Sequence, residues 1–390
     1  MAKPNITPAF SANETASGLS TDTNAAPSSA SLPWYQTAVS EKLNLRYPII
    51  QAGMAGGSTT PELVAAVSNA GGLGSLGAGY MTAEQIREAI RRIRELTDRP
   101  FAVNLFIPEP YEVRPEDIAA MNEALGAYRR KLGLPEAPPA PDRYSEPFEE
   151  QLETVLEERV PAFSFTFGQP SGDVIDRLRS RGIVTIGTAT TVSEAVRLEQ
   201  AGIDLIVGQG SEAGGHRGTF AVPHEQALVG TMALIPQIAD RVRVPIIAAG
   251  GIMDGRGVAA ALALGASGVQ MGTAFLTALE SGAHPRYQEE LKRSTDESTT
   301  LTRAFSGRPA RGIRNSFIAD MERCEVRIPP YPVQNALTRD IRQAAARAGD
   351  AEGMSLWAGQ ASALCRTEGA ADIIRRTVRQ VSELFGRLNA

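Results

Sequence analysis

The chain has 390 residues, of which 43% are hydrophobic and 21% charged, and its formal net charge at pH 7 is −5. This is the composition of a folded globular protein, and its acidic balance argues against a nucleic acid partner, which would need a basic face. No run approaches the roughly 18 consecutive apolar residues of a transmembrane helix, so we expect no membrane partner either.

The two cysteines, Cys324 and Cys365, stand far apart and show no metal-ligand spacing. Such sparse use of cysteine fits a reducing compartment. The N-terminus lacks the basic start and apolar core that a secretory signal requires. We therefore expect a cytoplasmic protein, while the sequence predicts no particular oligomeric state.

The first 33 residues are rich in Ser, Thr, Ala and Asn and show no apolar period. A segment of this composition buries too little apolar surface to offset the entropy that folding costs. We predict a disordered tail over residues 1–33, with the folded part of the chain beginning at residue 34.

Short apolar runs alternate with helical patterns from residue 48 onward. The runs cover 48–53, 73–79, 101–107, 162–168, 183–187, 204–210, 245–251 and 268–274. They are apolar almost throughout, as parallel strands buried on both faces are. Eight strands that each lead into a helix predict an α/β fold, a (βα)8 TIM barrel over residues 34–274, with an open doubly wound sheet as the alternative.

Two segments interrupt this alternation. Residues 108–161 contain an amphipathic helix, with Ile118, Met121, Leu125, Tyr128 and Leu132 at helical spacing, and then a proline-rich stretch. We interpret this segment as an elaborated connection between the third and fourth strands. Residues 275–390 are expected to form a mostly helical, smaller domain on the substrate side of the barrel, ending in a C-terminal helix.

The turns after the last two strands contain small residues that leave the backbone amides accessible. Gly250 and Gly251 follow the seventh strand, and Gly272 and Thr273 end the eighth. In such barrels the chemistry lies at the carboxyl ends of the strands, and these two turns commonly bind a phosphate through bare backbone amides. Glycines that merely form turns are the plain alternative for either position alone, but the pair favours a phosphate site.

Another glycine motif needs a different interpretation. Gly72, Gly74 and Gly77 match the dinucleotide fingerprint G-x-G-x-x-G, but a predicted helix precedes them where a strand is required, so we reject a Rossmann site. No cluster of His, Cys, Asp and Glu has metal-ligand spacing, so we predict no metal. A G-x-S-x-G nucleophile motif is also missing.

The segment GQGSEAGGHRGTF, residues 208–220, places His216 among five glycines just after the sixth strand. Histidine exchanges a proton near physiological pH, so at the mouth of a barrel His216 is a candidate general base. Gln209 suits the edge of a heterocycle with alternating donors and acceptors. Gly214, Gly215 and Gly218 would let backbone approach a flat ring.

For three other residues the sequence either leaves two roles open or indicates a structural role. Glu212 either orients His216 or caps a turn. His224 and His284 are expected to be structural.

Five ordered segments now resemble a known family: QAGMAGG (51–57), FAVNLF (101–106), GQGSEAGGHRG (208–218), AAGGI (248–252) and GVQMGTAF (268–275). Together they resemble the FMN-dependent nitronate monooxygenases, formerly called 2-nitropropane dioxygenases. Segments 304–317, 331–335 and 357–362 are similar to the part that this family carries after its barrel. The resemblance covers roughly residues 38–365.

The resemblance implies a flavoprotein with FMN across the barrel mouth and His216 as the catalytic base. Backbone at Gly53, Met54 and Ala55, the amides of Asn104 and Gln209, and Gly214 would meet the flavin ring; Gly251, Gln270, Met271, Gly272 and Thr273 would surround its phosphate. The implied reaction is the oxidation of alkyl nitronates by O2 to a carbonyl compound and nitrite. A neutral nitroalkane would first lose its α proton to the base.

The sequence also offers candidate residues for binding the substrate, and it leaves two alternative functions open. Arg308, Arg311 and Arg314 are candidates for closing over an anionic substrate, and Tyr331 for a wall of its pocket. The nearest alternative is an NAD(P)H-dependent flavin enoyl reductase of the same fold. The insertion and the long C-terminal segment argue against this alternative. A barrel that binds flavin or phosphate without catalysis is the second alternative.

Overall fold

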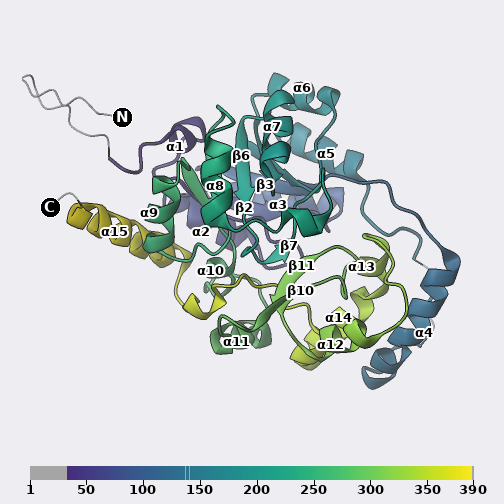
Figure 1. The fold of residues 1–390 in the computed structure, drawn as a ribbon. Coiled ribbons are helices and arrows are strands. Elements are labelled where there is room, and N and C mark those ends of the chain that lie inside the picture. The colour runs from purple at the N-terminus through teal and green to yellow at the C-terminus, as the bar shows by residue number, and fades with distance from the viewer. Residues whose placement is uncertain (1–32, 137, 140, 389–390) are drawn as a thin grey trace, which may run out of the picture. The chain divides into compact units, whose positions relative to one another are not determined.

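The computed structural model describes residues 33–136, 138–139 and 141–388, and contacts join the described residues from Trp34 onward into one compact unit. The disordered tail predicted for residues 1–33 lies, apart from Pro33, outside the described residues and stays a prediction. Figure 1 shows the order of the elements in space.

Eight parallel strands form the central barrel, in the order β1-β9-β8-β6-β5-β4-β3-β2. Their bounds are β1 (Ile49–Gln51), β2 (Gly74–Gly77), β3 (Phe101–Phe106), β4 (Ala162–Thr166), β5 (Val184–Ala189), β6 (Leu205–Gln209), β8 (Ile246–Ala249) and β9 (Gly268–Met271). The Leu73 amide donates to Ile49 and its carbonyl accepts from Gln51, each over 2.9 Å, which brings the first strand against the second. The predicted TIM barrel is thus confirmed, and the open-sheet alternative is wrong because β1 has neighbours on both sides.

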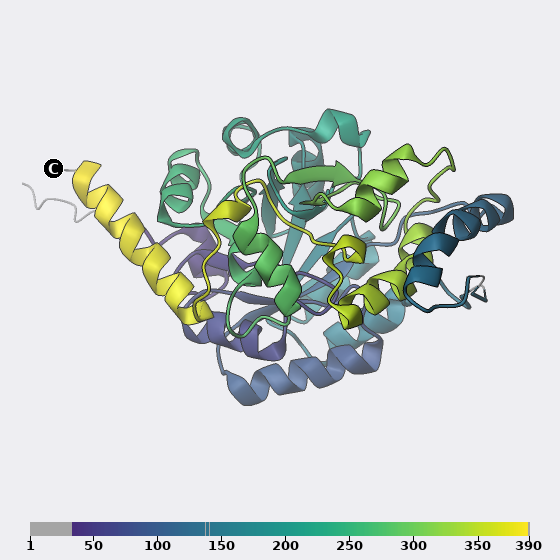
Figure 2. The same ribbon diagram turned by 90° about the horizontal axis from the view of Figure 1, so that it is seen from below.

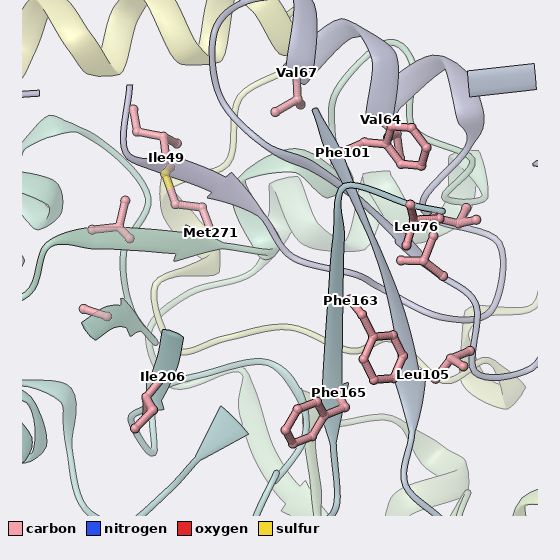
Figure 3. Close-up of a cluster of buried hydrophobic side chains, with 14 of the residues drawn as sticks. Ile49, Val64, Val67, Leu76, Phe101, Leu105, Phe163, Phe165, Ile206 and Met271 are labelled. Atoms are coloured by element: carbon pink, nitrogen blue, oxygen red, sulfur yellow. The ribbon is translucent and has the colours of Figure 1, made fainter. Parts of the chain in front are cut away.

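The continuous apolar runs contribute side chains to two layers of the core, one inside the barrel and one between the strands and the helices. Along β1, Ile49 belongs to the cluster between strands and helices, whereas Ile50 belongs to the inner cluster with Leu73, Ala102 and Leu205. Successive side chains of a strand point to opposite faces, so both faces of each strand are apolar and buried. Figure 3 shows part of the outer layer, where Phe101 of β3 lies near Val64 and Val67 of α2, and Leu105 of β3 lies near Phe163 and Phe165 of β4.

Helices alternate with the strands, and α1 precedes the first of them. They are α1 (Ala38–Lys42), α2 (Pro61–Asn69), α3 (Ala83–Leu96), α6 (Gly172–Ser180), α7 (Val192–Gln200), α8 (Thr231–Ala239) and α9 (Gly255–Ala263), with the 3-10 turn η1 (His224–Ala227) before α8. Thr82 begins α3 with a capping box, in which its hydroxyl and the Gln85 side chain bond reciprocally to the backbone. Thr60 caps α2, and Pro61 stands at its first position.

The connection between β3 and β4 contains two helices, α4 (Pro115–Lys131) and α5 (Phe148–Glu157). Met121 and Leu125 of α4 pack against Phe305, Phe317 and Ile341 from the C-terminal part of the chain, beside α12 and α14 in Figure 1. In contrast, α5 packs against α3 on the barrel. The long connection therefore reaches the cover of the barrel mouth.

The segment after β9 contains the helices α10 (Thr273–Leu276), α11 (Pro285–Arg293), α12 (Ser316–Arg323), α13 (Val333–Leu337), α14 (Arg339–Ala348) and α15 (Ala370–Leu388), with the 3-10 turns η2 (Ala351–Gly353) and η3 (Ser362–Leu364). It also contains two strands that a mostly helical segment does not anticipate, β10 (Thr299–Thr302) and β11 (Ala310–Ile313). With β7 (Gly215–His216) they form a three-stranded antiparallel sheet. The C-terminal helix α15 packs against α2 and α9 of the barrel, along one side in Figure 2. The domain limits predicted from the sequence stay predictions.

Candidate functional site

A cavity of about 540 Å³ lies at the carboxyl ends of the strands, between the barrel and the segments that cover it. Most of the residues predicted to bind a cofactor line it, and so does His216: Gly53, Met54, Ala55, Asn104, Gln209, Gly214, Gly215, Gly250, Gly251, Gln270, Gly272 and Thr273. The structure thus gathers into one cavity residues that are more than 200 positions apart in the sequence. Its volume is in the range of ordinary small-molecule sites.

Two predicted residues are not part of the cavity lining. The Met271 side chain is buried in the outer core, because its position at the end of β9 points it toward the helices. A side chain at Gly218 would come within 2.7 Å of Thr188, so this glycine allows close packing of the loop on β5. Its amide donates to the Gln209 side chain over 2.9 Å.

Backbone amides gather where the sequence predicts a phosphate. Gly250 and Gly251 have φ angles of 115° and 71°, a left-handed conformation that favours glycine. Among the residues that the structure describes, the amides of Gly251, Gly272 and Thr273 have no hydrogen-bond acceptor within the protein. Gly251 is exposed, Gly272 is partly buried and Thr273 is buried, and all three line the cavity, so these free donors fit an anionic group bound there.

The opposite part of the cavity is formed by fixed polar groups and a close backbone approach. A Cβ atom on Gly53 would lie 2.6 Å from Cβ of Asn104, so only glycine fits there. The Asn104 side-chain amide donates to the Ser164 hydroxyl over 2.9 Å. Both residues line the cavity beside bare backbone, an arrangement that suits a flat ring with polar edges.

The loop that carries His216 is held by the protein on several sides. Residues 215 and 216 form β7, and His216 is paired with Ala310 of β11. The buried Arg217 donates to the carbonyls of Gly210, Gln209 and Ala227 over 2.6 to 3.0 Å. The burial of Arg217 could not be predicted, because an arginine that follows a histidine in a polar loop gives no signal of burial in the sequence.

His216 lines the cavity among aromatic rings, with ring centroids 5.5 Å from Phe167, 6.0 Å from Tyr331 and 5.4 Å from Trp357. Its Nε2 lies 2.8 Å from the hydroxyl of Ser306. Burial, with smaller contributions from the positive charges of Arg308 and Arg342, lowers the pKa of His216 to about 3. The imidazole is therefore neutral at physiological pH and has a lone pair to offer.

Glu212 serves as a helix cap and does not contact His216. Its carboxylate accepts from the Thr231 amide over 2.8 Å and from the Thr231 hydroxyl over 2.9 Å, at the first residue of α8. A carboxylate at a helix N-terminus is favourable because it satisfies free amides and complements the helix dipole. Of the two roles left open by the sequence, the structure favours capping.

The other two histidines have structural contacts. Nδ1 of His284 accepts from the Arg286 amide over 3.1 Å and so caps α11, although the residue also lines the cavity. His224 lies outside the main cavity, with Nδ1 3.0 Å from Arg303 and 2.9 Å from Glu225.

The arginines singled out in the sequence do not line the main cavity. Arg308 lies over the Phe167 ring, 4.1 Å from its centroid, and forms an ion pair with Glu109. Arg311 donates to the Ser211 carbonyl over 3.0 Å. Arg314 pairs with Glu322 near the surface. Tyr331 stands behind His216 and Phe167 and lines a smaller neighbouring pocket.

Two other arginines, Arg339 and Arg342 of α14, line the main cavity instead. Arg342 donates to the backbone and side-chain oxygens of Asn335 over 2.7 and 2.9 Å. Within the described ranges neither guanidinium has a carboxylate partner at ion-pair distance. Arg339, Arg342, Gln343 and Ala346 line the cavity at helical spacing, a pattern that in the sequence looks like an ordinary solvated face.

Metal-binding and membrane-spanning features are both absent from the described residues. The part of the chain that the structure describes holds no group of three or more His, Cys, Asp or Glu side chains suited to a metal ion. Within the same residues, none of the helices combines the length and apolar character needed to cross a membrane.

Comparison with known sequences gives a consistent result. A family model described as "Nitronate monooxygenase" matches residues 36–380. A probable nitronate monooxygenase of Staphylococcus saprophyticus is 49% identical over 353 residues, which cover 90% of this chain and 99% of that protein. One of Staphylococcus aureus strain Newman is 48% identical over 353 residues, with the same coverage.

Comparison with solved structures agrees in fold. The nitroalkane oxidase of Streptomyces ansochromogenes superposes with a TM-score of 0.83 at 41% identity, covering 90% of this chain and all of that one (100%). FabK of Thermotoga maritima gives a TM-score of 0.72 at 32% identity, covering 91% of this chain and 98% of that one. Both similarities extend across the barrel and the segments that cover it.

Proposed function

Because the chain belongs to the nitronate monooxygenase family, we propose that it uses FMN and O2 to oxidise alkyl nitronates to a carbonyl compound and nitrite. The protein is an oxidoreductase, and its family and the nitroalkane oxidase structure support oxidation of nitronates or nitroalkanes. The proposal adds the cofactor, the products and the roles of individual residues. One observation carries it: the imidazole of His216 lines the same cavity as three backbone amides, those of Gly251, Gly272 and Thr273, that have no acceptor among the described residues.

The fit of FMN rests on the donor set of the cavity. The amides of Gly251, Gly272 and Thr273 would hold the phosphate, as amide donors in a glycine-rich turn do. Gly53, Asn104 and Gln209 would border the ring at the other end. When bound, FMN supplies the redox chemistry, taking electrons from the nitronate and passing them to O2.

His216 would act as the general base toward neutral nitroalkanes. Removal of the α proton needs a neutral base at the substrate, and the low pKa keeps His216 neutral. An imidazole with so low a pKa is a weak base in the free site. A nitronate formed beside it would raise its pKa, because an adjacent negative charge favours the imidazolium.

Arg342 and Arg339 would stabilise the anion. Nitronates carry a negative charge, and these two guanidiniums line the cavity without carboxylate partners among the described residues. Arg342 is also one of the charges that depress the pKa of His216. The same positive field thus opposes protonation of the base and favours the anionic product of deprotonation.

Two measurements on the purified protein test the proposal. We expect a flavin absorption spectrum, with FMN released on denaturation, and nitrite release from a preformed nitronate in air. A colourless protein that takes up no added flavin would contradict it.

The rival enoyl reductase function is separated by adding NADH or NADPH without oxygen. We expect the flavin absorbance to persist with either nucleotide and to bleach with a nitronate. Rapid bleaching by a nicotinamide nucleotide, with no response to nitronates, would favour the reductase. A yellow protein inert toward both would favour the non-catalytic barrel.

A further inference from the structure

The residue that contacts His216 through its ring nitrogen comes from a distant part of the chain. Ser306 lies in the loop between β10 and β11, and its hydroxyl oxygen is 2.8 Å from Nε2 of His216. The serine is 1% exposed and does not line the cavity. It therefore approaches the imidazole from the protein side and leaves the cavity side to the substrate.

The hydrogen bonds around Ser306 decide which ring nitrogen carries the proton. A serine hydroxyl has one hydrogen to donate and two lone pairs. The Ser306 hydroxyl lies 3.1 Å from the Arg308 carbonyl, and its oxygen accepts from the Arg308 amide at 3.3 Å. If the hydrogen goes to the carbonyl, Nε2 of His216 must be the donor to the remaining lone pair.

The opposite arrangement leaves more groups without partners. If the hydroxyl donated to Nε2, the Arg308 carbonyl would lose its hydrogen-bond donor among the described residues. The proton of the imidazole would then lie on Nδ1, for which the described part of the chain offers no acceptor. The loss of a donor to the Arg308 carbonyl is costly beside a serine that is 1% exposed, whereas His216 is only partly buried and lines the cavity. The geometry therefore favours the tautomer with hydrogen on Nε2.

The loop holds Ser306 in place through the segments that cover the barrel. The hydroxyl of Thr338 donates to the Phe305 carbonyl over 2.5 Å, and the Gln334 side-chain amide donates to the Ala304 carbonyl over 2.8 Å. Gly307 has a φ of 82°, and a Cβ atom there would lie 2.3 Å from the Pro329 carbonyl oxygen. The serine therefore has little freedom to follow a different imidazole tautomer.

We propose that Ser306 is a positioning residue that fixes His216 in the Nε2–H tautomer, so that the lone pair of Nδ1 is the one that receives the α proton of a nitroalkane. The tautomer assignment stands on the hydrogen bonds alone. The assignment of Nδ1 as the proton acceptor rests on the proposed function.

The tautomer is read directly from 15N NMR of histidine, because protonated and unprotonated ring nitrogens resonate far apart. The chain has only three histidines, so the full-length protein, labelled with 15N-histidine, gives few signals, and H224Q and H284Q assign them. At pH 7 we expect hydrogen on Nε2 of His216 in the wild type. In Ser306→Ala we expect a mixture, with both nitrogens shifted toward intermediate positions.

The matched control is Ser294→Ala, which removes a buried hydroxyl bonded to Ser362 over 2.8 Å outside the cavity. It should leave the His216 signals unchanged. Hydrogen on Nδ1 in the wild type would overturn the proposal, as would an unaltered Nε2–H tautomer in Ser306→Ala.

Kinetics tests the second half of the proposal. In Ser306→Ala, kcat/KM for a neutral nitroalkane should fall on the order of tenfold, as expected for the loss of one hydrogen bond, while that for the preformed nitronate should change less than twofold. Equal losses on both substrates would overturn the positioning role. Wild-type protein without nitrite release from either substrate would refute the proposed function, and the NMR result would still test the tautomer.

Discussion

The side chain of Gln209 spans the loop that carries His216. Its amide nitrogen donates to the His216 carbonyl over 3.1 Å, and its amide oxygen accepts from the Gly218 amide over 2.9 Å. The sequence suggested that Gln209 reads the edge of a ring. Its contacts also make it a clamp that closes the loop, and because the residue lines the cavity its role at a ring edge stays a prediction.

Replacing Gln209 by Met should loosen this loop. The substitution keeps the length of the side chain but removes two neutral hydrogen bonds, so we expect the free energy of unfolding to fall by about 1–3 kcal/mol. Urea denaturation measures the change. Gln237→Met, on the exposed face of α8, should cost less than about 0.5 kcal/mol. A Gln209→Met protein as stable as the wild type would show that the clamp is not needed.

Glu212 is expected to matter for stability and not for proton transfer. Glu212→Ala removes a carboxylate that caps α8, so the free energy of unfolding should fall by about 1–2 kcal/mol. The ratio of nitroalkane to nitronate turnover should stay as in the wild type. A selective loss of nitroalkane turnover would instead indicate that Glu212 orients His216.

The depressed pKa of His216 predicts a pH dependence of stability. The folded protein holds this imidazole neutral with a pKa of about 3, whereas the unfolded chain takes up the proton near pH 6.5. The stabilising contribution is therefore complete above pH 6.5 and is lost as the pH falls toward 3. Between pH 7 and pH 5 the wild type should lose up to about 2 kcal/mol more than His216→Gln. Parallel loss in both proteins, measured by denaturation at the two pH values, would contradict the low pKa.

Arg342 should be selective for the charge of the substrate. Arg342→Met should raise KM for a preformed nitronate about tenfold, the effect of one lost charge-assisted hydrogen bond, with a smaller effect on KM for a neutral nitroalkane. Arg347→Met, on the exposed side of the same helix, is the control and should leave both values unchanged. An unchanged KM for the nitronate in Arg342→Met would remove this arginine from the site.

The barrel could be predicted because its strands leave a strong signal. Parallel strands buried on both faces need continuous apolar runs; seven of the eight runs contain a whole barrel strand, and the fifth, 183–187, overlaps β5, which extends to Ala189. The short strands of the second sheet have no such run. Thr299–Thr302 is polar, and Gly215–His216 is only two residues long, so neither pattern indicates a strand.

The parts of the candidate site that are formed by backbone could be predicted from the sequence. The parts that are formed by long side chains could not. Glycines at strand ends mark positions at the barrel mouth whatever their neighbours are. The direction of an arginine side chain depends on partners from elsewhere in the chain. Arg308 turns toward Phe167 and Glu109, whereas Arg342, on a helix that looks solvated in the sequence, faces the cavity.

Ser306 illustrates the same limit. Its contact with His216 joins positions 90 residues apart through the pairing of β7 with β11. Nothing in the segment AFSGRPARG marks this serine, because the pairing depends on two strands that the sequence does not reveal.

The role of His216 as general base is tested most directly by nitrite release from His216→Ala with two substrates, a neutral nitroalkane and its preformed nitronate. The nitroalkane reaction should slow by about 10²-fold or more, because it needs the base, and the nitronate reaction should slow only a few-fold. Equal losses with the two substrates, in a variant that still binds its flavin, would contradict this role.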